Sequence, residues 1–275
     1  MGTRITILCD NTVGPLSGTL GEHGFAALVE YDGGALLFDT GGGATLLPNA
    51  ERMRRELRGV PVVLSHGHRD HTGGLLPLLQ HAGGREVHAH PGVFAARYAL
   101  RKGEPPRAIG MPHDETLFRE HGARFVLESG FREIGPGVFL TGEVPRTTVF
   151  EQGDGGLFRD DAGQVPDPLP DDQSLVIGTE KGLVLVLGCC HAGIVNTIEH
   201  ARARTGIADI YAVIGGTHLG FSAAHQLEET VRRLRSYRIR KLCGSHCTGF
   251  AGAARLAREF PGAYYPACVG YTLET

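Results

Sequence analysis

The sequence contains no apolar run that approaches the ~20 residues of a membrane-spanning helix, and no basic and then apolar signal region precedes the strand-like segment Thr3–Leu8. It also lacks an excess of positive charge, because 27 Lys and Arg stand against 30 Asp and Glu, for a formal charge of -3. Phosphate backbones are bound by concentrated Lys and Arg. We therefore expect a cytoplasmic protein with a small-molecule substrate, and neither a nucleic acid nor a membrane as partner.

Two further absences narrow the chemistry. No Gly-x-Ser-x-Gly segment occurs, which disfavours a serine hydrolase built on a nucleophile elbow. Six cysteines are present, but no export signal accompanies them, and disulfides persist in oxidising compartments. Metal ligation or simple burial is therefore the better explanation for most of these cysteines. Histidine, in contrast, is abundant at 14 of 275 residues, and several histidines cluster.

Strand-like and helix-like segments alternate along the chain, and the same rhythm occurs twice. Strands are expected at 4–9, 26–31, 35–38, 60–64, 86–90, 124–127, 138–141, 174–177, 182–187, 210–214, 241–243 and 263–273, and helices at 45–57, 73–81, 194–204, 223–237 and 251–260. The pattern predicts an α+β fold with two mixed sheets face to face and helices outside, in a single domain spanning 1–275. Residues 101–122 are interpreted as an irregular insertion, and the acidic segment 151–172 as a solvated loop or a lid.

The most informative segment follows the apolar strand ending at Leu64. It reads Ser-His-Gly-His-Arg-Asp-His over residues 65–71 and places three imidazoles and one carboxylate within six residues, directly before a helix. At such a strand-to-helix turn, His66 and His68 can reach one metal ion, and Asp70 and His71 can reach a second about 3–4 Å away. The segment therefore predicts a metal centre.

The motif His-x-His-x-Asp-His after a buried strand, preceded by Phe38-Asp-Thr-Gly41, resembles the metallo-β-lactamase superfamily. Within it, the chain is most similar to the subgroup that contains the archaeal dihydropterin–aminobenzene ribofuranosyl phosphate synthase. The segments that carry this likeness are 21–24, 141–146, 188–193, 215–218 and 246–249. The resemblance implies an αββα four-layer sandwich with metals at one edge, and a role for Asp39 in bracing a ligand histidine.

The chain departs from the superfamily at two ligand positions. No histidine precedes the hairpin that begins at Gln173, and Cys189 stands where the resemblance implies a bridging aspartate. In one interpretation His191 supplies the missing ligand, His246 completes the second site, and Cys189 lies near the metals as a thiolate. In the other, one metal is bound firmly and a second weakly or not at all. We expect two divalent ions, zinc in the first instance, with manganese or iron as options. Cys190, Cys243 and Cys247 are interpreted as packing residues.

The resemblance and the motif together favour a metal-dependent hydrolase that directs a metal-activated water at a small, anionic ester, lactone or phosphoester. Asp70 would bind metal and orient the water. His218 is either a metal ligand or, as we favour, the group that stabilises the oxyanion or protonates the leaving group. His23, Glu143 and Arg146 are predicted to bind substrate, because they lie in segments similar to the subgroup. Open alternatives are a transferase of the pterin-condensing synthase type, an iron-dependent redox enzyme and a non-catalytic metal-binding module. The oligomeric state is left open, with a homodimer as one option.

Overall fold

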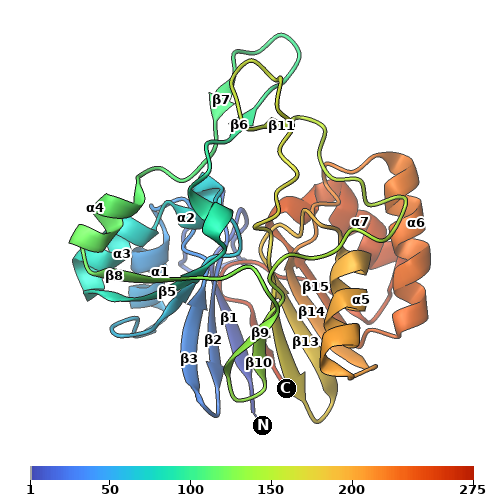
Figure 1. Ribbon diagram of the computed structural model, residues 1–275. Coiled ribbons are helices and arrows are strands. Elements are labelled where there is room, and N and C mark those ends of the chain that lie inside the picture. Colours follow the sequence, from blue (N-terminus) through green and yellow to red (C-terminus); the bar gives the residue numbers. More distant parts are fainter. Residues whose placement is uncertain (1) are drawn as a thin grey trace.

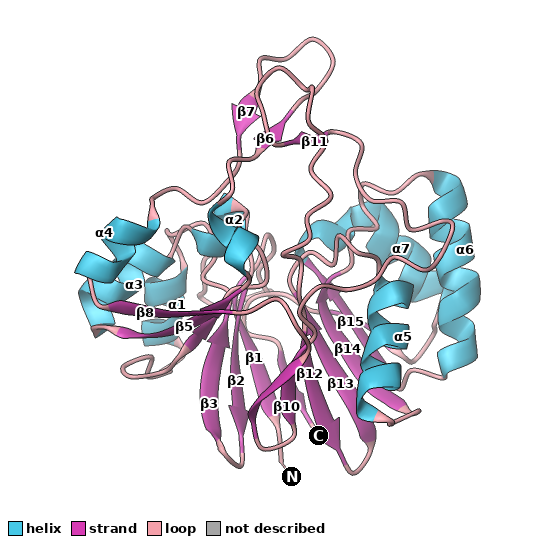
Figure 2. Cartoon of the chain, viewed as in Figure 1, coloured by secondary structure: helices cyan, strands magenta, loops and turns pink. Residues whose placement is uncertain are grey.

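The computed structural model describes residues 2–275 and contains two seven-stranded mixed sheets packed face to face (Figures 1 and 2). The first sheet is built from the N-terminal half and one strand from the C-terminus. Its strands, in spatial order, are β17 (Thr272–Glu274), β1 (Arg4–Cys9), β2 (Ala26–Tyr31), β3 (Gly34–Phe38), β4 (Val62–Val63), β5 (Arg85–Ala89) and β8 (Ala123–Leu127). From β3 onward these strands run parallel, so the loops that follow β3 and β4 emerge at one edge.

The second sheet is built from the C-terminal half. Its strands, in spatial order, are β16 (Tyr264–Pro266), β15 (Lys241–Ser245), β14 (Ile210–Gly216), β13 (Gly182–Leu187), β12 (Leu175–Thr179), β10 (Val138–Leu140) and β9 (Arg132–Gly135). Strands β13, β14, β15 and β16 are mutually parallel. Their carboxyl ends therefore lie along the same edge of the sheet, which is where ligands bind in parallel α/β arrangements.

Helices cover the outer face of each sheet. On the first sheet these are α1 (Leu46–Arg52), α3 (Leu75–Ala82) and α4 (Glu115–Glu120), and on the second α5 (Ile194–Thr205), α6 (Ala224–Leu234) and α7 (Gly249–Glu259) (Figure 1). Strand β13 shows why both sheet faces are buried: Val184 and Val186 pack between the sheets, whereas Leu183, Leu185 and Leu187 pack under the helices. This continuous apolar run is typical of a strand buried on both faces. The expected αββα four-layer sandwich is thereby confirmed.

A small third sheet stands apart from the sandwich, above the edge at which β4, β13, β14 and β15 end (Figure 1). It joins β6 (Tyr98–Ala99), β7 (Arg107–Ala108) and β11 (Leu157–Phe158), so it combines the two segments 95–110 and 152–168. We call residues 95–110 together with 152–168 the cap. The cap contains parts of both segments that the sequence analysis interpreted as an irregular insertion and as a loop or lid.

Three sequence-based element predictions were wrong in detail. The expected strand 263–273 is two strands in different sheets, because the chain turns between them, with the Tyr271 amide bonded to the Cys268 carbonyl oxygen and Gly270 at a φ of 91°. The expected helix 45–57 ends at Arg52, since Arg54 takes a left-handed backbone with φ of 53°. Helix α4 was missed inside 101–122, although Asp114 is an N-cap whose side chain accepts a hydrogen bond from the Leu117 amide. Over residues 2–275, no helix combines the length and apolar character needed to cross a bilayer.

Candidate metal centre

The functional side chains come from the ends of strands that meet at one edge. The segment 65–71 follows β4 and leads into the short helix α2 (Arg69–Thr72). Cys189 and His191 follow β13, His218 follows β14, and His246 follows β15. These residues are far apart in the sequence, but the parallel strands place them over a common point, as the sequence analysis expected of His218 and the other strand ends.

The backbone at these strand ends is held in an unusual conformation. Asp39, Cys190, His218 and His246 have φ values of 61°, 60°, 56° and 48°. The left-handed region is costly for residues other than glycine, and such residues gather at functional sites when the surrounding packing holds them there. The tight turns after β3, β13, β14 and β15 therefore aim side chains back toward the edge rather than away from it.

Gly67 allows the two histidines on either side of it to share one site. A Cβ atom at this position would lie 2.0 Å from the Val93 carbonyl oxygen and 2.5 Å from an Arg97 guanidinium nitrogen, so only glycine fits. The Gly67 amide donates a 2.9 Å hydrogen bond to Asp171 Oδ2, and Arg97 Nη2 lies 2.5 Å from Asp171 Oδ1. The loop between His66 and His68 is thus fixed to the base of the cap.

Asp39 contacts His71 directly and reaches His66 through Ser65, and its role in bracing a ligand histidine stays a prediction. Its Oδ1 accepts the Ser65 amide at 2.7 Å, and its Oδ2 accepts the Ser65 hydroxyl at 2.7 Å and lies 2.7 Å from His71 Nδ1. The Ser65 hydroxyl also lies 2.9 Å from His66 Nδ1. Both imidazoles therefore present Nε2 to other candidate ligands, His66 to His68 and His71 to Cys189, the arrangement by which carboxylates orient metal-ligating histidines.

Replacing Asp39 with asparagine should lower metal affinity about 10- to 100-fold, because the amide cannot accept both contacts at the Oδ2 position. Competition with a chromophoric chelator measures this change. The matched control is Glu86→Gln, which removes a 2.8 Å pairing with His88 on the same sheet but outside the cavity. Unchanged metal affinity in Asp39→Asn would contradict the bracing role.

His246 is positioned by two residues that the sequence analysis did not single out. Asp10 Oδ1 accepts a 2.7 Å hydrogen bond from the His246 amide, and Asn11 Oδ1 lies 2.8 Å from His246 Nδ1. Both follow directly after β1, so the Asp-Asn pair at a strand end was the available signal. The contacts leave His246 Nε2 at 3.2 Å from His71 Nε2 and 3.3 Å from Asp70 Oδ2.

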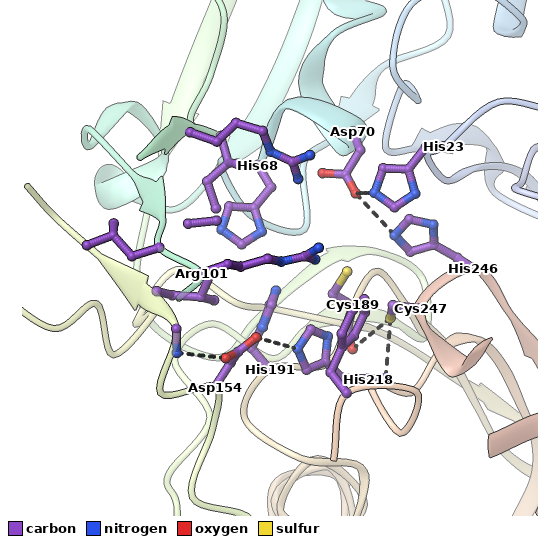
Figure 3. Close-up of a pocket in the computed structure, with 17 residues that line it drawn as sticks. His23, His68, Asp70, Arg101, Asp154, Cys189, His191, His218, His246 and Cys247 are labelled. Atoms are coloured by element: carbon purple, nitrogen blue, oxygen red, sulfur yellow. Dashed lines mark hydrogen bonds and ion pairs between the residues drawn. The ribbon is translucent and has the colours of Figure 1, made fainter. Parts of the chain in front are cut away.

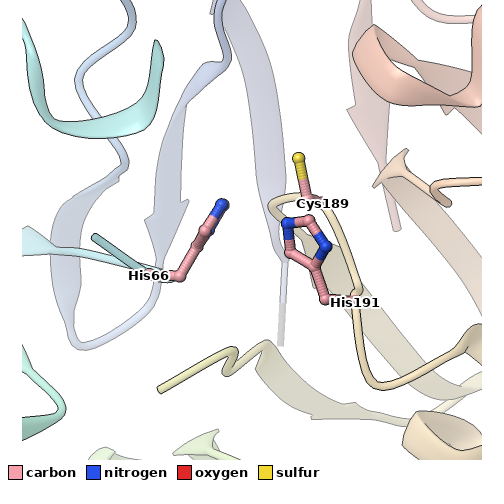
Figure 4. Close-up of side chains that lie close together, drawn as sticks. All are labelled: His66, Cys189 and His191. Atoms are coloured by element: carbon pink, nitrogen blue, oxygen red, sulfur yellow. The ribbon is translucent and has the colours of Figure 1, made fainter. Parts of the chain in front are cut away.

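The structure brings the predicted ligands into two adjoining groups. In the first, His66, Cys189 and His191 have ligand atoms within 4.8 Å of one another (Figure 4), and His68 Nδ1 lies 2.9 Å from His66 Nε2. In the second, the ligand atoms of His71, Cys189 and His246 also lie within 4.8 Å of one another. Asp70, His246 and His23 form an adjacent group of the same kind. Cys189 belongs to both main groups, and its Sγ lies 3.1 Å from His71 Nε2.

Burial sets the protonation of the first group. It lowers the pKa of His68 to about 3 and holds the pKa of His66 and of His191 well below the ordinary imidazole value. For His71, burial acts in the same direction, but the carboxylates of Asp39 and Asp70 outweigh it and raise the pKa to about 9. The first group therefore offers neutral imidazoles, which is the form that binds metal.

Cys247 was interpreted as a packing residue, but it lies beside the site. Its Sγ accepts the His218 amide at 3.3 Å, and it forms a compact group with Cys189 and His218 (Figure 3). Burial opposes its ionisation, but hydrogen bonding with Cys189 and the charge on His218 hold the pKa of the Cys247 thiol well below its ordinary range. Burial and the neighbouring Cys247 raise the pKa of Cys189 instead.

The two groups open into a cavity of about 250 Å³ that lies between the sandwich and the cap (Figure 3). His218 lies on its wall, and its Nε2 is 3.6 Å from Asp154 Oδ2 of the cap. His23 also lies there, with Nε2 at 3.1 Å from Asp70 Oδ2. The cavity is lined by His23, His68, Asp70, Ala99, Leu100, Arg101, Arg107, Ile109, Asp154, Gly156, Leu157, Cys189, His191, His218, Phe221, His246 and Cys247.

Two residues predicted to bind substrate are engaged elsewhere. Glu143 Oε1 lies 3.0 Å from His90 Nε2, and neither residue lines the cavity. Arg146 donates to the carbonyl oxygens of His191 at 2.7 Å and Pro168 at 2.8 Å, so its guanidinium supports the loop that carries His191. Substrate binding by Glu143 and Arg146 stays a prediction. Asp154, Arg101 and Arg107 line the cavity without having been singled out, because no short motif surrounds them.

The residues present fit metal ions. Among residues 2–275, the buried nitrogen atoms without a hydrogen-bond partner include His68 Nε2 and both ring nitrogens of His191. Buried polar atoms are normally paired, so unpartnered imidazole nitrogens that face sulfur and carboxylate groups indicate an ion as the missing partner. The ligand types, imidazole with thiolate and carboxylate, suit zinc and the neighbouring transition metals.

The comparisons with known proteins agree with this geometry. The sequence model of the metallo-beta-lactamase superfamily matches residues 20–246. The 7,8-dihydropterin-6-methyl-4-(beta-D-ribofuranosyl)-aminobenzene-5'-phosphate synthase of Methanocaldococcus jannaschii is 31% identical over 271 residues, which cover 94% of this chain and 91% of that protein. The crystal structure of Tm1679 is described as a metal-dependent hydrolase of the beta-lactamase superfamily. Its sequence is 32% identical to this chain, and the two structures superpose with a TM-score of 0.84 over 99% of each chain. Zn(2+)-bound PqqB from Methylobacterium extorquens shares the fold at 14% identity and a TM-score of 0.59, with 99% of this chain and 100% of that chain covered.

Proposed function

Because the chain belongs to the metallo-beta-lactamase superfamily, we propose that it is a metal-dependent hydrolase that acts on a small, anionic ester, lactone or phosphoester. The observation that carries the proposal is the set of unpartnered, buried imidazole nitrogens facing a cavity of about 250 Å³. The fold supports it, because a structure that matches this chain with a TM-score of 0.84 is described as a metal-dependent hydrolase. A cavity of this size suits a small molecule.

We assign the ligands to two zinc sites. His66, His68 and His191 would hold one ion, and Asp70, His71 and His246 the other. Cys189, whose sulfur belongs to both groups, would stand between the two sites in place of a carboxylate. When bound, divalent ions lower the pKa of a coordinated water toward ~7 and polarise the scissile oxygen.

The chain's own residues would orient the reaction. Asp70 would accept a hydrogen bond from the attacking water, since its Oδ2 faces the cavity between His23 and His246. His218 lies on the opposite wall, where its imidazole would donate a hydrogen bond to the developing oxyanion or the leaving group. Asp154 supports the His218 imidazole from the cap at 3.6 Å. The cap covers the cavity and would limit access of bulk water.

Hydrolysis is tested by the origin of the oxygen in the product. The protein is reconstituted with zinc, manganese or iron, its metal content is measured by elemental analysis, and turnover of aryl phosphodiester, ester and lactone substrates is followed in ¹⁸O-labelled water. We expect about two ions per chain and one solvent oxygen in the product. Product formation without solvent oxygen would contradict hydrolysis, and iron with visible absorbance would favour redox chemistry.

A second candidate function is group transfer to an acceptor other than water. It is favoured by the likeness to the synthase of Methanocaldococcus jannaschii, at 31% identity across 94% of this chain. For this function, the same metal-loaded protein should release diphosphate from a pterin diphosphate analogue only when an aromatic acceptor is present. Release without an acceptor, with solvent oxygen incorporated, would instead support the hydrolase.

A further inference from the structure

The cap carries its arginines in two different settings. Arg97 is buried at the base of the cap and contacts the carboxylates of Asp167 at 2.9 Å and Asp171 at 2.5 Å. Arg159 pairs with the same Asp167 at 2.7 Å. Arg101 and Arg107, in contrast, are exposed and make no side-chain hydrogen bond or ion pair with any part of the chain that the structure describes.

Both unpaired arginines face the metal centre. Arg101 and Arg107 line the same cavity as His68, Asp70 and Cys189, and Figure 3 shows Arg101 extended over the ligand cluster. Strand pairing explains their placement, because Arg107 lies opposite Ala99 in the β6–β7 ladder and Arg101 follows two residues after Ala99. One short hairpin thus presents two guanidinium groups to a single cavity.

The carboxylates of the cavity are already engaged. Asp70 contacts His23 and His246, and Asp154 contacts His218 and accepts the Gly156 amide at 2.8 Å. The cap end of the cavity therefore carries two uncompensated positive charges. A positive region inside a cleft attracts anions and concentrates them there.

We infer that Arg101 and Arg107 form a binding site for a terminal phosphate or carboxylate of the substrate, on the cap side of the cavity that they share with the candidate metal ligands. The guanidinium fork matches the geometry of both anions. This inference deepens the proposed function and rests on it, because it treats the ligand cluster as the place of reaction.

The cavity wall also indicates the chemical character of the rest of the substrate. Leu100, Ile109, Leu157 and Phe221 also line this cavity. Phe221 is 57% exposed, and its ring centroid lies 4.9 Å from that of His218. An exposed aromatic ring inside a cavity offers a stacking surface. The substrate class is accordingly a small molecule with an apolar or aromatic body and a terminal anion.

The test measures equilibrium binding to the zinc-loaded protein, with phenyl phosphate, benzoate and neutral benzamide as probes. The variants are Arg101→Gln, Arg107→Gln and the double variant. The control is Lys102→Gln, because Lys102 is a cation in the same hairpin that does not line the cavity. Metal content is measured for every variant, so that loss of the metal centre is distinguished from loss of the anion site.

We expect each substitution to weaken binding of an anionic probe about tenfold or more, with benzamide binding and metal content unchanged. Phenyl phosphate and benzoate separate the two kinds of anion, and binding should fall with added salt. Anion binding that is equal in the wild type and the double variant, or absent from the wild type, would overturn the inference. Since benzoate contains no bond that the proposed reaction cleaves, its binding is measured without turnover, and an intact anion site in a protein that does not hydrolyse would reject only the proposed function.

Discussion

Replacing Asp70 with asparagine is expected to lower kcat by at least about 10³-fold and to reduce the bound metal toward one ion per chain. Asp70 Oδ2 faces three imidazoles, at 3.1 Å from His23 Nε2, 3.3 Å from His246 Nε2 and 3.8 Å from His71 Nε2. Although burial opposes its ionisation, His71 and hydrogen bonds from His23 and His246 hold the pKa of Asp70 well below its ordinary range. Asparagine keeps the shape of this group but removes its charge and one acceptor.

Steady-state kinetics and elemental analysis of the same sample measure both effects. Glu104→Gln serves as the control, because Glu104 is an exposed carboxylate of the cap hairpin that does not line the cavity. A His68→Ala variant should show the same loss of activity. It should lose metal from the site formed by His66, His68 and His191, rather than from the site that contains Asp70. Wild-type rates in these variants, with metal content unchanged, would reject the metal-dependent mechanism.

Replacing Arg97 with methionine is expected to destabilise the protein by about 3–5 kcal/mol, because it leaves the buried carboxylate of Asp171 without its arginine and removes one of the two arginines that pair with Asp167. The side chains of Arg97, Asp167 and Asp171 are 1%, 0% and 0% exposed. Urea unfolding measures the change in free energy. Arg159→Met is a matched control, since Arg159 pairs with the same Asp167 from a position that is 29% exposed, where such pairs contribute about 0–1 kcal/mol.

The loss of unfolding free energy in Arg97→Met should depend on pH with a definite sign. The backbone of Leu169 and the two arginines outweigh burial and lower the pKa of Asp167 below its ordinary value. A carboxylate with a lowered pKa contributes stability that is present above the unfolded pKa of about 3.9 and is lost as the pH falls. The difference between Arg97→Met and the wild type should therefore narrow as the pH falls below about 4. A difference that widens in acid would contradict this assignment.

The Arg97 network also connects stability to function. Asp171 joins Arg97 at the base of the cap to the Gly67 amide, between His66 and His68. The two unpaired arginines and Asp154 belong to the same cap. Loss of Arg97 should thus disturb both the ligand loop and the cavity above it, whereas loss of Arg101 or Arg107 should leave both in place.

Some parts of the site could be predicted because their signal is local. The candidate ligands His66, His68, Asp70 and His71 lie within six residues at a strand-to-helix turn, and their spacing alone predicts shared metal binding. Cys189, His191 and His246 required the resemblance to a family, since each stands alone after its strand. The structure brings all of these residues together, and places Cys247, which the sequence analysis assigned to packing, beside them.

Other parts carried no local signal. The support of His246 by Asn11 spans 235 positions, and that of Gly67 by Asp171 spans 104. The sequence also misplaced the chain after residue 263 as one strand, because a short apolar segment does not reveal which sheet edge it joins. The same reason applies to Arg101 and Arg107, whose exposure is evident from their charge but whose direction depends on the pairing of β6, β7 and β11.

The sequence by itself determined the layered α+β architecture and the core of the metal-binding motif, because apolar periodicity and short-range ligand spacing act over a few residues. Only the tertiary structure decided which strand ends meet, which imidazole nitrogens face the cavity and which cap arginines remain unpaired. Those properties arise from contacts between distant segments, whose geometry depends on strand order and on buried polar pairing across the whole fold.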